Sequence, residues 1–108
     1  MKELLNRVQA TVSMEYERTA KKFGKANNGP HESYAVILEE FQEATDCATG
    51  FAFLLERFWH DVKNDCTTTR NGDLKEMQDR AEHAAAEWIQ VAAMCHKATI
   101  KKETGGGE

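Results

Sequence analysis

The acidic side chains between residues 39 and 46 form the group in this chain whose spacing best suits chemistry. Glu40 and Glu43 are three residues apart, so on a helix their carboxylates lie one turn from each other beside an apolar stripe. Glu39 and Asp46 lie farther round toward solvent. Two carboxylates placed in this way repel each other unless a cation lies between them, and Mg²⁺ prefers such oxygen ligands. The run therefore predicts a magnesium site, with an ordinary solvated acidic face as the alternative.

Three segments with helical periodicity would position these acids. Apolar residues recur along one side of residues 3–23, of a segment that starts near Pro30, and of residues 73–101. Gly24 follows the first segment, and Pro30 suits the first turn of a helix because its φ is fixed. The run 64–72 is rich in polar residues that favour turns, so it predicts a loop.

The last two helices are expected to lie antiparallel, since a short loop joins them and each has an apolar stripe to bury. The third helix should begin at Asp73, with Glu76 completing a capping box. If the turn is centred near Thr68, facing residues have numbers that add up to about 135. This register places Glu87 within one or two turns of Glu43. Glu87 shares its stripe with apolar residues, so its charge needs a partner.

The predicted fold is all-α: a long antiparallel helical hairpin plus an N-terminal helix. Cys47 and Cys95 are predicted in the interior of the hairpin, and Trp59 and Trp88 are predicted as anchors of the core or of a subunit interface. A single chain of three helices would leave apolar surface uncovered, so we expect a homodimer or homotetramer with a core like that of a four-helix bundle. Small residues on the third helix would allow close approach of a neighbouring helix: Ala81, Ala84, Ala85 and Ala92.

The composition indicates one domain, which we expect at residues 1–102, followed by a flexible tail at 103–108. A net charge of −4 leaves no surplus of positive charge for a phosphate backbone, so nucleic acid is not an expected partner. Uncharged stretches fall well short of the ~20 residues that cross a membrane. Three cysteines without a CxxC spacing indicate free thiols in a reducing cytoplasm.

Three stretches carry a resemblance to a known family: residues 22–24, residues 31–43 and residues 86–94. They resemble the MazG-like nucleotide pyrophosphohydrolases, especially the small phage-type members. The signature of that family is E-E-x-x-E on one helix and E-x-x-D on the next, which together bind Mg²⁺ for the hydrolysis of nucleoside triphosphates to monophosphates and pyrophosphate. Glu39-Glu40-x-x-Glu43 matches the first half in full.

The resemblance implies roles for the matched residues. Glu40, Glu43 and Glu87 would hold Mg²⁺, and Gln90 occupies the position of the motif aspartate as a fourth metal ligand. Glu39 and Glu40 are the expected catalytic residues, and Glu39 or another nearby carboxylate would take a proton from the attacking water.

Basic residues before the acidic helix are candidates for contact with the triphosphate. Lys22 and Lys25 would contact phosphate, and His31 at the helix start would contact the substrate. Ordinary solvated lysines, and a polar residue in a first helical turn, are the alternatives.

Two features depart from the family pattern. Gln90 supplies an amide oxygen but no charge, which lowers the expected metal affinity, and the gap between the two half-motifs is longer than is usual. The alternative function is therefore a catalytically inactive helical protein that keeps the scaffold and binds a partner or itself.

Overall fold

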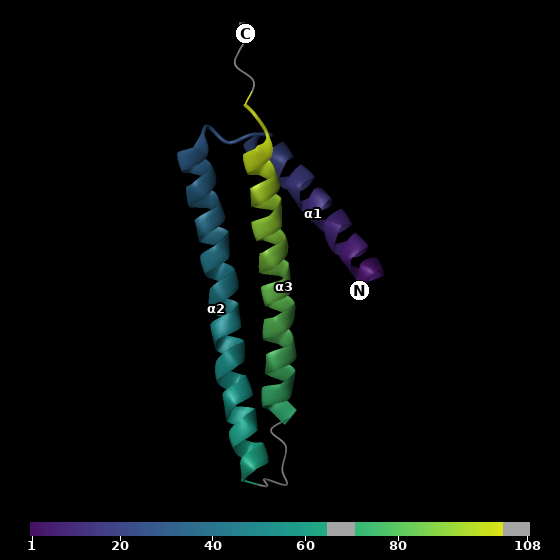
Figure 1. The fold of residues 1–108 in the computed structure, drawn as a ribbon, viewed down its shortest axis with the longest axis vertical. Coiled ribbons are helices and arrows are strands. Elements are labelled where there is room, and N and C mark those ends of the chain that lie inside the picture. The colour runs from purple at the N-terminus through teal and green to yellow at the C-terminus, as the bar shows by residue number, and fades with distance from the viewer. Residues whose placement is uncertain (65–70, 103–108) are drawn as a thin grey trace, which may run out of the picture.

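A computed structural model of the chain describes residues 1–64 and 71–102 and is all-α. Three helices follow one another: α1 (Lys2–Phe23), α2 (Pro30–Lys63) and α3 (Asn71–Thr99) (Figure 1). No strand occurs within these described residues. The predicted tail at 103–108 and most of the predicted loop at 64–72 lie outside them.

Local signals set the helix ends between α1 and α2. Gly24 has a φ of 97°, a left-handed conformation that glycine adopts without strain, and its N–H donates to the carbonyl of Ala20 at 2.9 Å. Pro30 lies in the first turn of α2, as predicted. Asn28 joins the loop to that turn, because its backbone N–H and its side-chain Nδ2 both donate to Glu32, at 3.2 and 3.0 Å.

The predicted capping box at the start of α3 is wrong. The helix begins at Asn71, so Asp73 lies within its first turn. The carboxylate of Asp73 instead accepts two hydrogen bonds from Arg57 of α2, at 2.7 and 2.6 Å. A bidentate, charge-assisted pair is stronger than a local cap, so the contact between helices prevails over the local pattern.

Helices α2 and α3 lie side by side and run in opposite directions (Figure 1). Arg57 faces Asp73, and the guanidinium of Arg80 lies where a Cβ on Gly50 would project. Facing residues therefore have numbers that add up to about 130 rather than the predicted 135. The difference is slightly more than one helical turn, and it moves Glu87 directly opposite Glu43.

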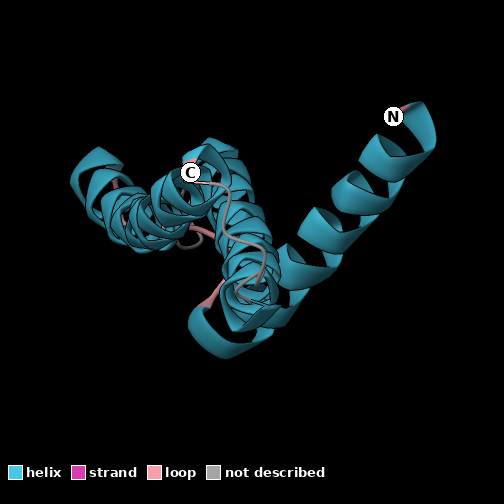
Figure 2. Cartoon of the chain, turned by 90° about the horizontal axis from the view of Figure 1, so that it is seen from below, coloured by secondary structure: helices cyan, strands magenta, loops and turns pink. Residues whose placement is uncertain are grey.

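Helix α1 packs on α3 from about Val12 onward. Tyr16 forms a buried cluster with Ala93 and Met94, and its hydroxyl donates to the carbonyl of Lys25 at 2.8 Å. The N-terminal half of α1 diverges from the other two helices (Figure 2). Its apolar side chains are consequently exposed, although the periodicity predicts a continuous buried stripe: Leu4, Leu5 and Val8.

Two apolar stripes run along α3, and the one that contains Val91 and Met94 is buried. Met77, Val91 and Met94 are buried, whereas the alanine-rich face is largely exposed. Cys95 is exposed, so its predicted interior position is wrong; Cys47 is half-buried. Trp59 and Trp88 are 56% and 45% exposed, which excludes them from the core of the single chain. Both stripes on α3 are apolar, and the contacts with α2 determine which of the two is buried.

The radius of gyration is 19.0 Å, against about 13 Å for a compact domain of 100 residues. The fold is therefore extended and exposes much apolar surface. Among the described residues, no helix has the length and apolar character to cross a membrane.

Candidate metal centre

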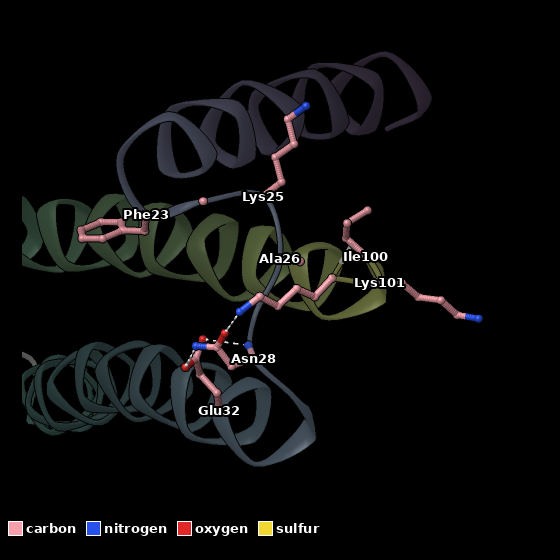
Figure 3. Close-up of a pocket in the computed structure, with 9 residues that line it drawn as sticks. Phe23, Lys25, Ala26, Asn28, Glu32, Ile100 and Lys101 are labelled. Carbon is pink, nitrogen blue, oxygen red and sulfur yellow. Dashed lines mark hydrogen bonds between the residues drawn. The ribbon is translucent and has the colours of Figure 1, made fainter. Parts of the chain in front are cut away.

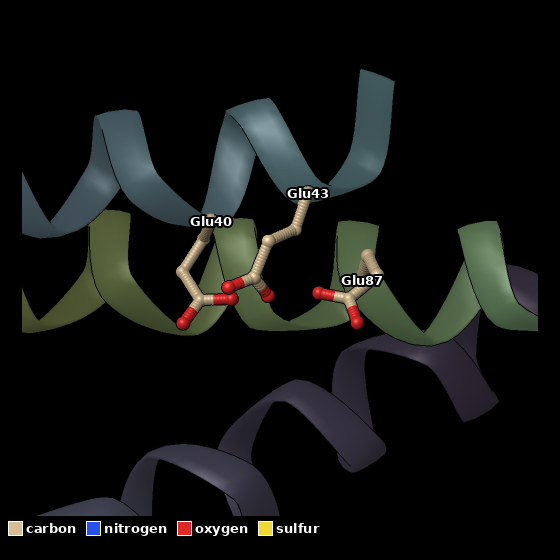
Figure 4. Close-up of side chains that lie close together, drawn as sticks. All are labelled: Glu40, Glu43 and Glu87. Atoms are coloured by element: carbon tan, nitrogen blue, oxygen red, sulfur yellow. The ribbon is translucent and has the colours of Figure 1, made fainter. Parts of the chain in front are cut away.

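Three carboxylates from two helices converge in the middle of the α2–α3 pair. Glu40 and Glu43 reach from α2 toward Glu87 of α3 (Figure 4). One oxygen from each of the three lies within 4.8 Å of the others. Glu40 and Glu87 are half-buried and Glu43 is exposed, so the cluster is shielded on one side and reachable from solvent on the other.

Helix geometry explains this convergence. The three-residue spacing puts Glu40 and Glu43 on one side of α2, one turn apart. The observed register then sets Glu87 across from Glu43. The sequence predicts a separation of one or two turns between Glu43 and Glu87, and the structure brings them closer than that.

The surroundings of Glu40 favour its neutral form. Burial raises the pKa of the Glu40 carboxyl above its usual range, and four neighbouring carboxylates raise it further. In decreasing order of effect these are Glu43, Glu87, Glu39 and Glu15. The cluster therefore holds more negative charge than its surroundings stabilise.

The neighbouring carboxylate of Glu87 raises the pKa of Glu43 above its usual range. The hydrogen bond to Glu87 raises the pKa of Glu43, because the protonated carboxyl is the donor, and the negative charge of Glu87 acts in the same direction. A divalent cation could replace this proton and neutralise both carboxylates.

A fourth carboxylate comes from α1, and the sequence-based reasoning missed it. Glu15 accepts a hydrogen bond from Nε2 of Gln90 at 2.5 Å and from Nε of Arg18 at 2.9 Å. Hydrogen bonds to Arg18 and Gln90 lower the pKa of Glu15, so it stays ionised beside Glu40. Glu15 forms an i,i+3 pair with Arg18, which resembles an ordinary surface pair. Only the packing of α1 on α3 brings Glu15 next to Gln90.

Gln90 therefore faces Glu15 with its amide N–H. Because the nitrogen is a donor, the carbonyl oxygen of the same amide is the group that remains for a cation. An aspartate at position 90 would place a further negative charge next to Glu15.

The spacing of the carboxylate oxygens in the cluster suits Mg²⁺. Ligand oxygens lie about 2.0–2.1 Å from this ion, so two of them on one ion are about 3–4 Å apart. The oxygens of Glu40, Glu43 and Glu87 already lie within 4.8 Å of one another, so rotations of flexible side chains would suffice. The residues fit a hard divalent cation in number, charge and donor type.

A pocket of about 550 Å³ adjoins the cluster and includes residues of all three helices. Glu40 and the exposed Glu39 line it from α2, Gln90 and the buried Lys97 line it from α3, and Arg18 lines it from α1. The pocket thus has carboxylates that could bind a metal ion and basic side chains that could bind an anion.

The basic residues predicted to contact substrate lie elsewhere. The ammonium of Lys22 lies over the ring of Phe23, 5.4 Å from its centroid. Lys25 lines a neighbouring pocket of about 490 Å³, and its side chain points away from Glu32 (Figure 3). His31 is exposed in the first turn of α2. The structure does not bring these three side chains to the acidic cluster.

Comparison with known protein families finds no match, and neither the curated proteins nor the solved structures include a match to this chain. The site must therefore be interpreted from its own residues.

Proposed function

We propose that this chain is a Mg²⁺-dependent nucleoside triphosphate pyrophosphohydrolase. The observation that supports the proposal most directly is the convergence of Glu40, Glu43 and Glu87 within 4.8 Å. The adjoining pocket supports it further, since it has room for a ligand and contains both carboxylates and cationic side chains.

Each acid has a separate task in this proposal. Glu40, Glu43 and Glu87 would hold Mg²⁺, and they would do so in their ionised forms. When bound, the ion would neutralise phosphate charge and lower the pKa of a coordinated water. Glu39 lines the pocket beside Glu40, where it would accept a proton from the attacking water. The water oxygen forms a bond to the α-phosphorus, the bond to the bridging oxygen breaks, and pyrophosphate leaves.

The ionised Glu15 acts on the site indirectly. It fixes the amide of Gln90 and adds negative charge next to Glu40. We propose that Gln90 contributes its oxygen to the cation site, and that the missing fourth charge weakens metal binding rather than abolishing it.

The test is release of pyrophosphate from a panel of canonical and modified nucleoside triphosphates, with and without Mg²⁺. Glu40→Ala and Glu43→Ala should abolish the release, whereas Glu56→Gln, an exposed change on the same helix, should leave it unchanged. Gln90→Asp should increase activity if the lost charge limits the enzyme. Absence of Mg²⁺-dependent release from every nucleotide would refute the proposal.

A second candidate function is that of a catalytically inactive helical interaction protein. The uncovered apolar face favours it, because Val8, Val12, Trp88 and Ile89 line an open groove between α1 and α3. Failure to release pyrophosphate, together with a melting temperature that Mg²⁺ leaves unchanged, would favour this function.

We also propose that two or more copies associate through this face and complete a bundle of the four-helix type. Isologous pairing is the commonest way to cover an apolar surface, and Trp88 would be its anchor. Light scattering of the wild type and of Trp88→Glu tests the assembly. We further propose that the protein is cytoplasmic, because Cys47 and Cys95 would remain thiols in that reducing compartment.

A further inference from the structure

Lys97 occupies an unusual place on α3. Only 6% of this residue is exposed, although lysine is almost never fully buried without a partner. Within residues 1–64 and 71–102, Lys97 belongs to no ion pair and its side chain donates no hydrogen bond. Lys97 lines the pocket, and a cationic side chain in a pocket wall that no protein carboxylate neutralises leaves a place for an anion.

Glu32 is the carboxylate on which the charge of Lys97 acts, but it forms no ion pair with Lys97. Glu32 lines the same pocket, and the positive charge of Lys97 lowers the pKa of Glu32 only after the stronger hydrogen bonds from Asn28. Both oxygens of Glu32 already accept hydrogen bonds from Asn28. Lys97 therefore remains available to a ligand.

A second cation lines the pocket from α1. Arg18 uses Nε and Nη2 to bind Glu15, and its Nη1 makes no hydrogen bond with another described residue. Arg18 and Lys97 thus face one cavity from two helices. Thr19 and Asn27 line the same cavity.

We propose that Lys97, together with Arg18, forms an anion subsite that binds a phosphate group of the triphosphate while another phosphate lies at the acidic cluster. This inference rests on the proposed function and names the residues that hold its substrate. Lys97 follows Glu87 by ten residues, or about 15 Å along the helix axis. Glu40, Gln90 and Lys97 nevertheless line one pocket, and their side chains reach into it, so a ligand with several phosphates can contact both ends whereas a single orthophosphate cannot.

Calorimetric titration with inorganic tripolyphosphate in the presence of Mg²⁺ tests the subsite, with orthophosphate as the short ligand. Lys97→Met should weaken binding of tripolyphosphate about tenfold or more, because a charge-assisted hydrogen bond is lost. Lys97→Arg should retain most of the affinity. Lys75→Met removes an exposed lysine from the same helix and should change the affinity less than twofold. Circular dichroism confirms that each variant is folded, and Lys97→Gln replaces the methionine variant if that one is not.

The hydrolysis assay separates this inference from the proposed function. Lys97→Met should raise KM about tenfold with little change in kcat, since the residue binds the substrate away from the reacting atoms. An unchanged KM and an unchanged affinity for tripolyphosphate would overturn the subsite and leave the proposed function intact. Binding that depends on Lys97 without any hydrolysis would support the subsite and refute the proposed function. Failure of the wild type to bind tripolyphosphate would also overturn the subsite.

Discussion

Glu40→Gln should stabilise the protein in the absence of divalent ions and remove its response to Mg²⁺. The change replaces a carboxylate by an amide of the same shape, so packing is preserved while repulsion within the cluster falls. In wild type an oxygen of Glu40 lies within 4.8 Å of one of Glu87. Two unit charges at that distance repel by about 0.9 kcal/mol in bulk water. Salt at 0.15 M screens about half of this energy.

The expected gain from removing this one pair is therefore about 0.4 kcal/mol, or a rise of about 2–3 °C in melting temperature. Loss of the repulsion with Glu43 adds to the rise. The response to Mg²⁺ should have the opposite sign. At ten times its dissociation constant, the ion should stabilise wild type by about 1.4 kcal/mol, or about 6–11 °C. Glu40→Gln should lose most of this stabilisation, because a ligand and a negative charge are both missing.

Thermal unfolding followed by circular dichroism, with chelator and then with increasing Mg²⁺, measures both effects. Glu56→Gln is the matched control, since it removes an exposed carboxylate from the same helix outside the cluster. A melting temperature of Glu40→Gln below that of wild type in chelator would refute repulsion within the cluster. Equal stabilisation of the variant and wild type by Mg²⁺ would refute Glu40 as a metal ligand.

Three further predictions concern the rest of the fold. With chelator present, the free energy of unfolding of wild type should fall relative to that of Glu43→Gln as pH rises from about 4.5 to 7. Folding raises the pKa of Glu43, so this carboxyl stabilises the folded state only while it is protonated. Urea titrations at several pH values measure the difference, and a constant or rising difference would contradict the prediction. Gly50→Ala should raise the urea midpoint, since the helix gains up to about 1 kcal/mol in propensity, whereas displacing the end of Arg80 costs only an exposed ion pair; a lower midpoint would mean that Arg80 cannot move. Asp73→Asn should lower the melting temperature by several degrees, because its bidentate bond to Arg57 is lost and Asp73 is only 14% exposed; a melt unchanged from that of wild type would show that the pair does not stabilise the fold.

The extent of the helices follows from local signals. Gly24 and Pro30 mark the end of α1 and the start of α2 because a left-handed conformation and a fixed φ act on single residues. The start of α3 is different: Asp73 has the local character of a cap, but Arg57, sixteen residues away in the chain, binds its carboxylate.

The composition of the acidic cluster could be predicted only in part. Periodicity identifies Glu40 and Glu43 as neighbours on one helix, and the estimated register places Glu87 nearby. The register itself depends on contacts such as those of Arg57 with Asp73, which bring together residues that are distant in sequence. The roles of Glu15 and Lys97 could not be predicted from the sequence. There Glu15 looks like half of a surface ion pair, and Lys97 looks like a solvated lysine.

The sequence by itself therefore determined the three helices, their approximate ends and the acids available to bind a cation, because these depend on residue type and on spacing along one chain. Only the tertiary structure decided which stripe of α3 is buried, that Glu87 lies opposite Glu43, that α1 brings Glu15 to Gln90, and that Lys97 is enclosed in a pocket wall. The physical reason is that a helix with two apolar stripes has two nearly equivalent ways to pack. The choice between them depends on side-chain contacts between helices, and no local pattern encodes those contacts.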